Sequence, residues 1–273
     1  MEEKNLVYRY DGSFRGILCC VYEIYTQKEF PAQILEEDDP ATLYPEKWVK
    51  TDEAHARRVW RSLPKKLGKR GTQMVRDGYW TCLPDKALTL CRFIARGYQA
   101  GPQVVDMLAD ETVNQLNQAL QYLYNETHLF QGFVRFSISG HVMTAAITPR
   151  NRVLPLLKDH FFQRYPEEYF LLYDKTHREA LIHQPGKGKL IPMEQFIPNP
   201  PDEEEQAYRA MWKQFYDTIA IRERENPKCR MSHLPKRYWG DMTEFQEMPV
   251  RSHGEKKSPV LQGSTPQPLP KGR

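Results

Sequence analysis

The chain has 273 residues, with 39 lysines and arginines against 35 acidic residues and therefore a formal net charge of +4. Hydrophobic residues make up 40% and charged residues 27% of the chain, a composition that excludes a fibrous or wholly disordered protein. The N-terminus lacks the pattern of a signal peptide, and no apolar stretch approaches the roughly 20 residues that a membrane helix needs. We therefore expect a cytoplasmic protein of one large domain or two small ones, with no membrane segment.

The N-terminal half is predicted to be mostly helical after one strand. Leu6–Tyr10 is rich in residues typical of strands, and the turn that follows offers Asp11 or Ser13 as a helix cap. Apolar residues at three- and four-residue steps then predict a series of amphipathic helices. These cover a segment from Phe14 to before Pro31 and the ranges 51–63, 83–97 and 113–128. We expect Pro64 to end the second of them.

The middle of the chain changes to the two-residue period of strands. A hairpin is predicted from strands over 130–138 and 141–148 around Ser139-Gly140, and a helix over 153–164 follows. Further strands are predicted over 169–174, 179–184 and 190–193, with a hairpin turn at Gly186–Lys189. The predicted fold class is α+β, a central antiparallel sheet with helices packed around it.

We expect one domain over residues 1–248, followed by a disordered tail over 249–273. Within the domain the helical subregion covers about 13–128, the sheet region about 130–193 and the C-terminal helices about 203–240. The tail holds five prolines and five basic residues against one acidic residue, so it carries the whole charge of +4. Net charge therefore gives the folded part no bias towards nucleic acid.

The run from Arg57 to Arg76 is the strongest local signal, because it holds eight basic residues and no acidic one. Arg57 and Arg61 share a helix face at four-residue spacing, and the later cations lie in a predicted loop around Gly68. Such a run suits the phosphate backbone of a nucleic acid, but it is equally typical of a solvated helix. The candidate contacts are Arg57, Arg58, Arg61, Lys65, Lys66, Lys69 and Arg70. The nearby aromatic residues Trp60, Tyr79 and Trp80 could stack on bases or lie in the core.

Two weaker patterns accompany this run. Arg222–Lys228 alternates arginine with glutamate before an aromatic segment at Pro235–Trp239, which is also typical of an exposed helix end. His160 and Arg164 lie one helical turn apart, so a histidine base could work beside a guanidinium that binds phosphate. A hydrogen-bonded packing histidine is the commoner explanation of such a residue.

The cysteines and glycines give no cofactor motif. The five cysteines include no C-x-x-C pair, and the chain has neither a phosphate-binding loop nor a dinucleotide fingerprint. We therefore predict no metal site and no cofactor in this chain.

Several short motifs follow one another along the chain. They are Tyr10–Phe14 with Gly16 and Leu18, Asn151-Arg152, His160-Phe161 with Arg164-Tyr165, Tyr173-Asp174 with Arg178, Trp212 with Phe215, and Pro235–Trp239. In this order they resemble the motifs of a bacterial family, the domain of unknown function 4130, which is described as a putative DNA metabolism or DNA repair protein. The resemblance covers most of residues 5 to 245.

The resemblance implies a companion role to a radical SAM protein of DNA modification or repair. The same domain also occurs fused to a uracil-DNA-glycosylase-like domain, which this chain lacks. SAM and an iron–sulfur cluster are then expected in the partner only, since the cysteine motif for that cluster is absent here. Carried over by position, the motif residues are Asp11, Ser13, Asn151, Arg152, His160, Arg164, Asp174 and Arg178.

Structural roles are available for some of these residues. Asp11 is suited to cap the first helix, and Asp174 is placed to pair with Arg178 across a hairpin turn. Asn151, Arg152 and Arg164 are the candidates for binding phosphate or a nucleotide, with His160 as the candidate catalytic base.

Three functions stay open at this point. The first is a DNA-binding accessory factor of a radical SAM partner, with the basic run in contact with DNA. The second is a hydrolase acting on damaged DNA or nucleotides through His160. The third is a protein–protein adaptor without DNA contact.

Overall fold

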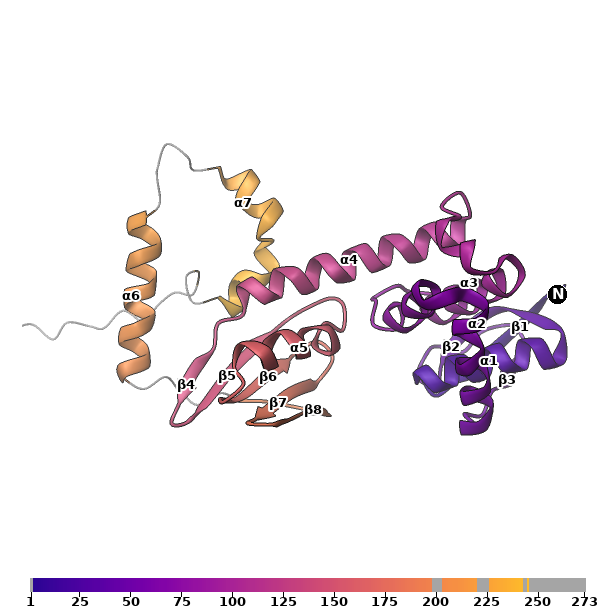
Figure 1. The fold of residues 1–273 in the computed structure, drawn as a ribbon, viewed down its shortest axis with the longest axis horizontal. Coiled ribbons are helices and arrows are strands. Elements are labelled where there is room, and N and C mark those ends of the chain that lie inside the picture. The colour runs from indigo at the N-terminus through magenta and orange to yellow at the C-terminus, as the bar shows by residue number, and fades with distance from the viewer. Residues whose placement is uncertain (1, 198–202, 220–225, 243–244, 246–273) are drawn as a thin grey trace, which may run out of the picture.

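The computed structural model describes residues 2–197, 203–219, 226–242 and 245 (Figure 1). The predicted tail over 249–273 and the basic stretch over 222–225 lie outside these residues. The elements in chain order are β1 (Glu2–Tyr10), α1 (Phe14–Gln27), β2 (Glu29–Glu36), β3 (Glu46–Trp48), α2 (Glu53–Gly78), α3 (Lys86–Ala100), η1 (Pro102–Asp106), α4 (Glu111–Phe133), β4 (Ser137–Ser139), β5 (Val142–Ile147), α5 (Leu154–Arg164), β6 (Tyr169–Asp174), β7 (Glu179–Gln184), β8 (Lys187–Pro192), α6 (Glu203–Ile219), α7 (Pro227–His233) and η3 (Lys236–Asp241).

The fold is α+β, as predicted, and it contains two sheets. The strand order is β2-β1-β3 in the small sheet and β4-β5-β6-β7-β8 in the large one. Figure 1 shows the two sheets apart from each other, with the long helix α4 running between the parts that contain them and α6 beyond the large sheet. Buried side chains of both parts belong to one hydrophobic cluster. None of the helices in the described part of the chain combines the length and apolar character that crossing a membrane requires.

The large sheet is mixed, which corrects the prediction of an antiparallel one. Three of its pairings are antiparallel, but β5 and β6 are parallel because α5 connects them as a crossover helix. The small sheet is parallel throughout and is built on a second strand–helix–strand unit, β1–α1–β2. Its strands β2 and β3 were not predicted.

Two predicted boundaries in the helical part are wrong. Helix α2 continues past Pro64 to Gly78 and breaks at Gly68, whose φ of 72° is left-handed. Helix α4 extends to Phe133 because its buried residues keep the helical spacing through Thr127 and Phe130. The predicted strand over 130–138 is therefore reduced to β4.

Two of the last three strands have the predicted bounds, whereas β8 begins at Lys187, three residues before the predicted range of 190–193. β6 and β7 have the expected bounds, and β7 pairs with β8 through a turn at Gly186, whose φ is 74°. The predicted hairpin turn at Gly186–Lys189 is thus present, but it is confined to Pro185 and Gly186, because residues 187–189 already belong to β8.

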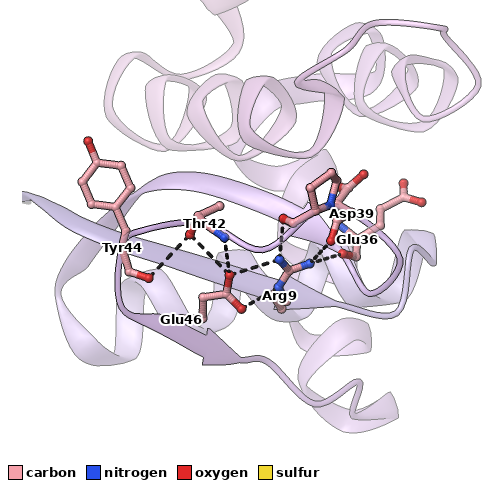
Figure 2. Close-up of polar contacts among 7 residues, drawn as sticks. Arg9, Glu36, Asp39, Thr42, Tyr44 and Glu46 are labelled. Atoms are coloured by element: carbon pink, nitrogen blue, oxygen red, sulfur yellow. Dashed lines mark hydrogen bonds and ion pairs between the residues drawn. The ribbon is translucent and has the colours of Figure 1, made fainter.

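A buried arginine ties the small sheet to the loop that follows β2 (Figure 2). Arg9 of β1 forms an ion pair with Glu46 of β3, with 2.7 Å between Nε and Oε2. Its guanidinium also donates to the backbone oxygens of Glu36, Asp39 and Pro40 at 2.7–2.9 Å. The hydrogen bond from Arg9 lowers the pKa of Glu46 to about 2, from an ordinary value of 4.5. This network fixes the acidic loop against the sheet.

We expect Glu46 to make stability depend on pH below 4.5. A carboxyl group whose pKa is lower in the folded than in the unfolded protein stabilises the fold at pH values above its unfolded pKa. This stabilisation is lost as the pH falls through the folded pKa. The Tm of wild type should therefore exceed that of Glu46→Gln by the most above about pH 4.5, and the difference should shrink towards pH 2. Thermal melts of both proteins between pH 2 and 7 measure this. A Tm difference that does not vary with pH would contradict the assignment.

Candidate functional site

The basic side chains of α2 lie on its solvent-exposed side. Successive helix residues are about 100° apart, so Arg57, Arg61 and Lys65 form one stripe along the surface. All seven predicted contacts in the basic run are exposed. The opposite stripe of the helix is buried and consists of Ala56, Val59, Leu63 and Leu67.

Few of these cations are neutralised. Arg57 pairs with Glu53 at 3.1 Å and Arg70 pairs with Asp106 at 2.9 Å. Arg61, Lys65 and Lys66 form no ion pair with any residue that the structure describes. This part of α2 therefore presents cations that are available to an anionic partner, and we call the exposed side of residues 57–69 the basic face.

A hollow lined by tyrosines opens beside the basic face. It has a volume of about 330 Å³ and lies between α1, α2 and α3. Its walls include Tyr22, Tyr25 and Tyr98, together with Arg58 and Ser62 of α2. We call it the tyrosine hollow, and its aromatic character makes it a surface on which an unpaired base can stack.

The rings of the tyrosine hollow are held in place. Tyr22 stacks on His55 with 3.8 Å between ring centroids, and the Tyr98 hydroxyl lies 2.5 Å from Oγ of Ser62. Tyr25 is 38% exposed, and burial of its remainder raises its pKa to about 12. The hydroxyl is therefore neutral at physiological pH and does not repel a phosphate. These tyrosines were not among the predicted contacts, although Tyr22 and Tyr25 are three residues apart on one helix.

The aromatic residues Trp60, Tyr79 and Trp80, for which base stacking and a place in the core were both open, pack against the core. Trp60 lies edge-on to Phe14 with 5.6 Å between centroids, and Tyr79 packs against both Phe14 and Trp80. Trp60 and Trp80 therefore contribute to the packing of the core.

A buried carboxylate in α4 organises the second region of interest. Glu126 is 4% exposed and accepts hydrogen bonds from four donors at 2.5–2.9 Å. The donors are the backbone N–H groups of Arg150 and Asn151, Nδ2 of Asn151 and the hydroxyl of Tyr238. Three segments that are distant in sequence therefore meet at one side chain.

Asn151 has a structural place in this network. It is 3% exposed, and its Oδ1 accepts the backbone N–H of Cys82 at 2.9 Å. Its side-chain nitrogen and oxygen are both used within the protein, so Asn151 positions the loop at residues 150–152 rather than presenting a free amide.

A cavity of about 560 Å³ lies over the Glu126 network. We call it the Glu126 cavity, and its lining comes from α4, from residues 81–84 and 150–151, and from the segment 232–237. The polar lining is Thr81, Cys82, Gln115, Gln118, Tyr122, Asn125, Glu126, Arg150, Asn151, Ser232 and Arg237, and the apolar lining is Leu83, Pro84, Ala119, Leu129 and Pro235.

Arg152 is held on the other side of the same loop. Its Nη2 lies 2.6 Å from Oε2 of the buried Glu179, and its guanidinium lies 5.2 Å from the Trp80 ring centroid. Burial opposes the charge, but the hydrogen bond to Glu179 outweighs it and raises the pKa of Arg152. Nε of Arg152 and Oε1 of Glu179 are buried without a hydrogen-bond partner among the described residues.

His160 and Arg164 share α5 but do not join Arg152. The exposed guanidinium of Arg164 donates to the hydroxyl of Tyr165 at 3.1 Å. Nε2 of His160 is buried without a hydrogen-bond partner in the described part of the chain, and its ring lies edge-on to Phe161. No contact recorded among the described residues brings these three side chains together.

The motif at Tyr10–Phe14 forms the turn that leads into α1. Ser13, not Asp11, is the N-cap, and its hydroxyl accepts the backbone N–H of Gly16 at 2.9 Å. Asp11 accepts hydrogen bonds from the hydroxyl and the backbone N–H of Ser13 at 2.7 and 3.0 Å. Partial burial raises the pKa of Asp11, but these hydrogen bonds outweigh it, so the pKa is lowered. The pair thus shapes the turn between β1 and α1.

Asp174 and Arg178 do not pair with each other. Asp174 is fully buried and lies 2.7 Å from Nδ1 of His177, while its other oxygen accepts backbone N–H groups of the turn. Arg178 has a left-handed φ of 52° and pairs with Glu194 at 3.2 Å. The expected pairing across the turn is wrong because this backbone directs the two side chains to different partners.

The described residues include no group of three histidine, cysteine, aspartate or glutamate side chains that could hold a metal ion. Of the described cysteines, Cys19, Cys20 and Cys91 are buried, and Cys82 and Cys229 are exposed.

The family model described as Domain of unknown function (DUF4130) matches residues 84–244, which is more than half of the chain. The match contains the Glu126 cavity almost entirely, whereas the basic face lies before it. A search of curated proteins found no match.

Proposed function

This chain belongs to the domain of unknown function 4130 family, and we propose that it is a DNA-binding accessory factor in DNA repair or metabolism that works with a radical SAM partner. The observation that carries the DNA-binding part is the basic face of α2. It presents Arg61, Lys65 and Lys66 in a row, exposed and without acidic partners among the described residues. Cations in this arrangement bind the phosphate backbone and release its counterions.

The tyrosine hollow favours an unpaired strand over a duplex. Stacking of a base on an aromatic ring needs a base that is free of its partner, and each such stack contributes about 1–3 kcal/mol. Arg58 belongs both to the basic face and to the wall of the hollow, with its guanidinium 5.9 Å from the Tyr22 ring centroid. A strand whose phosphates follow α2 would therefore pass beside this hollow.

The exposed apolar side chains of helix α6 support the proposal that the protein binds a protein partner. Its exposed apolar side chains recur at helical spacing, and monomeric proteins rarely expose such a row. They are Tyr208, Met211, Trp212 and Phe215, each at least 40% exposed. The same row would also suit a protein–protein adaptor that does not contact DNA. A measurement of DNA binding distinguishes this adaptor from the DNA-binding accessory factor.

The hydrolase alternative has its own test. Purified protein incubated with uracil-containing, nicked and abasic DNA should show turnover that His160→Ala abolishes if His160 is a catalytic base. Arg152 is paired with Glu179, Arg164 donates to Tyr165, and Nε2 of His160 is buried without a hydrogen-bond partner among the described residues, which favours the binding function over this alternative.

We expect binding of wild-type protein to a single-stranded oligonucleotide to fall steeply with salt. The logarithm of the affinity should decrease against the logarithm of salt concentration with a slope of about −3, since each phosphate contact contributes about −0.7 for a single strand. Fluorescence anisotropy between 50 and 300 mM salt measures this slope, with a duplex of the same sequence as the comparison. An affinity that is unaffected by salt, or is absent, would refute the proposed function.

A further inference from the structure

The Glu126 cavity has the size and the mixed lining of a small-molecule site. Its volume of about 560 Å³ falls within the range of roughly 300–1,000 Å³ that is usual for such sites. Apolar walls come from Leu83, Pro84, Ala119, Leu129 and Pro235. A flat, partly apolar group is suited to the space between them.

Two arginine side chains lie at the solvent-exposed edge of the Glu126 cavity. Arg150 and Arg237 are both exposed and both line the cavity. The guanidinium of Arg150 has no hydrogen bond or ion pair with any described residue. Arg237 lies 3.9 Å from Glu126 and donates to the hydroxyl of Tyr238 at 2.6 Å. An anionic group of a ligand would meet these arginines first.

The negative charge of Glu126 does not oppose such an anion directly. Its two oxygens are already occupied by four donors from the loop at 150–151 and from Tyr238. The carboxylate therefore serves as the floor of the cavity and the arginines as its charged rim.

Amide side chains of α4 supply a hydrogen-bonding wall. Gln115, Gln118 and Asn125 line the cavity from one side of the helix. Gln115 accepts from Thr89 and Gln118 donates to Asn114, which leaves each amide at least one further donor and acceptor for a ligand. Tyr122 on the same side is 70% exposed and presents an aromatic ring at the opening. Amides that read a polar edge, together with a ring for stacking, are the groups that proteins use for nucleobases.

We propose that the Glu126 cavity binds a nucleoside 5′-phosphate, with Arg150 and Arg237 on the phosphate and the amides of α4 on the base. This unit occurs both as a free nucleotide and at the 5′ end of a DNA strand. The site is separate from the basic face and does not depend on DNA binding by α2.

The exposed thiol of Cys82 in the cavity wall reports on occupancy, with Cys229 as the control. The full chain is treated with a maleimide in the presence of deoxynucleoside 5′-monophosphates, and labelling of each cysteine is followed by peptide mass analysis. Nucleotide at ten times its Kd should slow labelling of Cys82 about tenfold and leave Cys229 unchanged. Absence of protection by all four nucleotides overturns the proposal. Equal protection by inorganic phosphate also overturns it, because that result needs no base.

Two variants test the assigned contacts. Arg150→Gln removes the cation but keeps the backbone N–H that Glu126 accepts, and we expect about a tenfold loss of nucleotide affinity. Ala119→Phe fills the cavity and should abolish protection of Cys82. Lys187→Gln removes an exposed charge elsewhere and should change neither measurement. Nucleotide binding that survives Arg150→Gln unchanged refutes the site, even if Ala119→Phe does not fold.

A second comparison distinguishes a free nucleotide from the 5′ end of a DNA strand as the ligand. Oligonucleotides with and without a 5′-phosphate are tested for protection of Cys82 beside free nucleotides. Protection only by the phosphorylated strand assigns a DNA end, and protection only by mononucleotides assigns a free nucleotide. If nucleotides protect Cys82 while salt-dependent DNA binding is absent, this inference holds and the proposed function fails.

Discussion

Removing three cations from the basic face should weaken DNA binding by between one and two orders of magnitude at about 0.15 M salt. The variant is Arg61→Gln/Lys65→Gln/Lys66→Gln. These residues are exposed and have no acidic partner in the described part of the chain, so their replacement breaks no ion pair there. The slope of log affinity against log salt should become shallower by about 2, since each lost phosphate contact removes about 0.7. Anisotropy titrations of wild type and variant across the same salt series measure both effects.

A matched control separates the basic face from net charge. Lys158→Gln/Lys187→Gln/Lys189→Gln removes the same charge from α5 and β8, where these lysines are exposed. We expect this control to retain the wild-type salt slope. If both triple variants lose affinity equally, DNA is attracted by overall charge, and the basic face is not the binding surface.

The tyrosine hollow should be distinguishable from the basic face in the same assay. Tyr25→Leu keeps an apolar side chain but removes the ring that is most exposed in the hollow. The preference for single-stranded over duplex DNA should fall about fivefold or more, because one stack is worth about 1–3 kcal/mol. The salt slope should stay the same. Loss of salt dependence in this variant would contradict the division of roles.

The predictable parts of this fold are those that depend on local sequence. β6 and β7 have the expected bounds because two-residue alternation and a turn at residues 175–178 lie within one short segment. The basic face was likewise found from a continuous run of residues. β2 was missed because it contains Pro31 and belongs to a parallel pair, and parallel pairing depends on a connection through α1 rather than on a turn.

The Glu126 network could not be assembled from sequence because its members are far apart. Tyr238 lies 112 positions after Glu126, and Asn151 lies 25 positions after it. One signal was available: Glu126 occupies the buried side of α4 between Leu123 and Phe130. A carboxylate in such a position requires several donors, since burying an unpaired charge is costly. The sequence therefore contained a reason to expect a polar network there, but not the identity of its partners.

Substitution of Glu126 should be the most destabilising polar change in the described part of the chain. Glu126→Leu leaves the donors of Arg150, Asn151 and Tyr238 without an acceptor in a buried place. Each unsatisfied buried donor costs about 1–3 kcal/mol, so the loss of an acceptor for four donors should lower the free energy of unfolding by about 4 kcal/mol or more. Urea denaturation followed by circular dichroism measures this change. Nucleotide protection of Cys82 should be lost in the same variant because the loop at residues 150–151 and η3 are no longer fixed.

A double-mutant cycle with Tyr238 separates the network from a general defect of α4. Tyr238→Phe alone removes one donor and should cost about 1–2 kcal/mol. Combined with Glu126→Leu it should cost less than the sum of the single changes by at least about 0.5 kcal/mol, since residues of one network couple. Glu167→Gln, an exposed carboxylate outside the network, should stay within about 0.5 kcal/mol of wild type. Additive effects of the two network changes would show that Glu126 and Tyr238 act separately, and the three segments would then be joined by apolar packing rather than by this carboxylate.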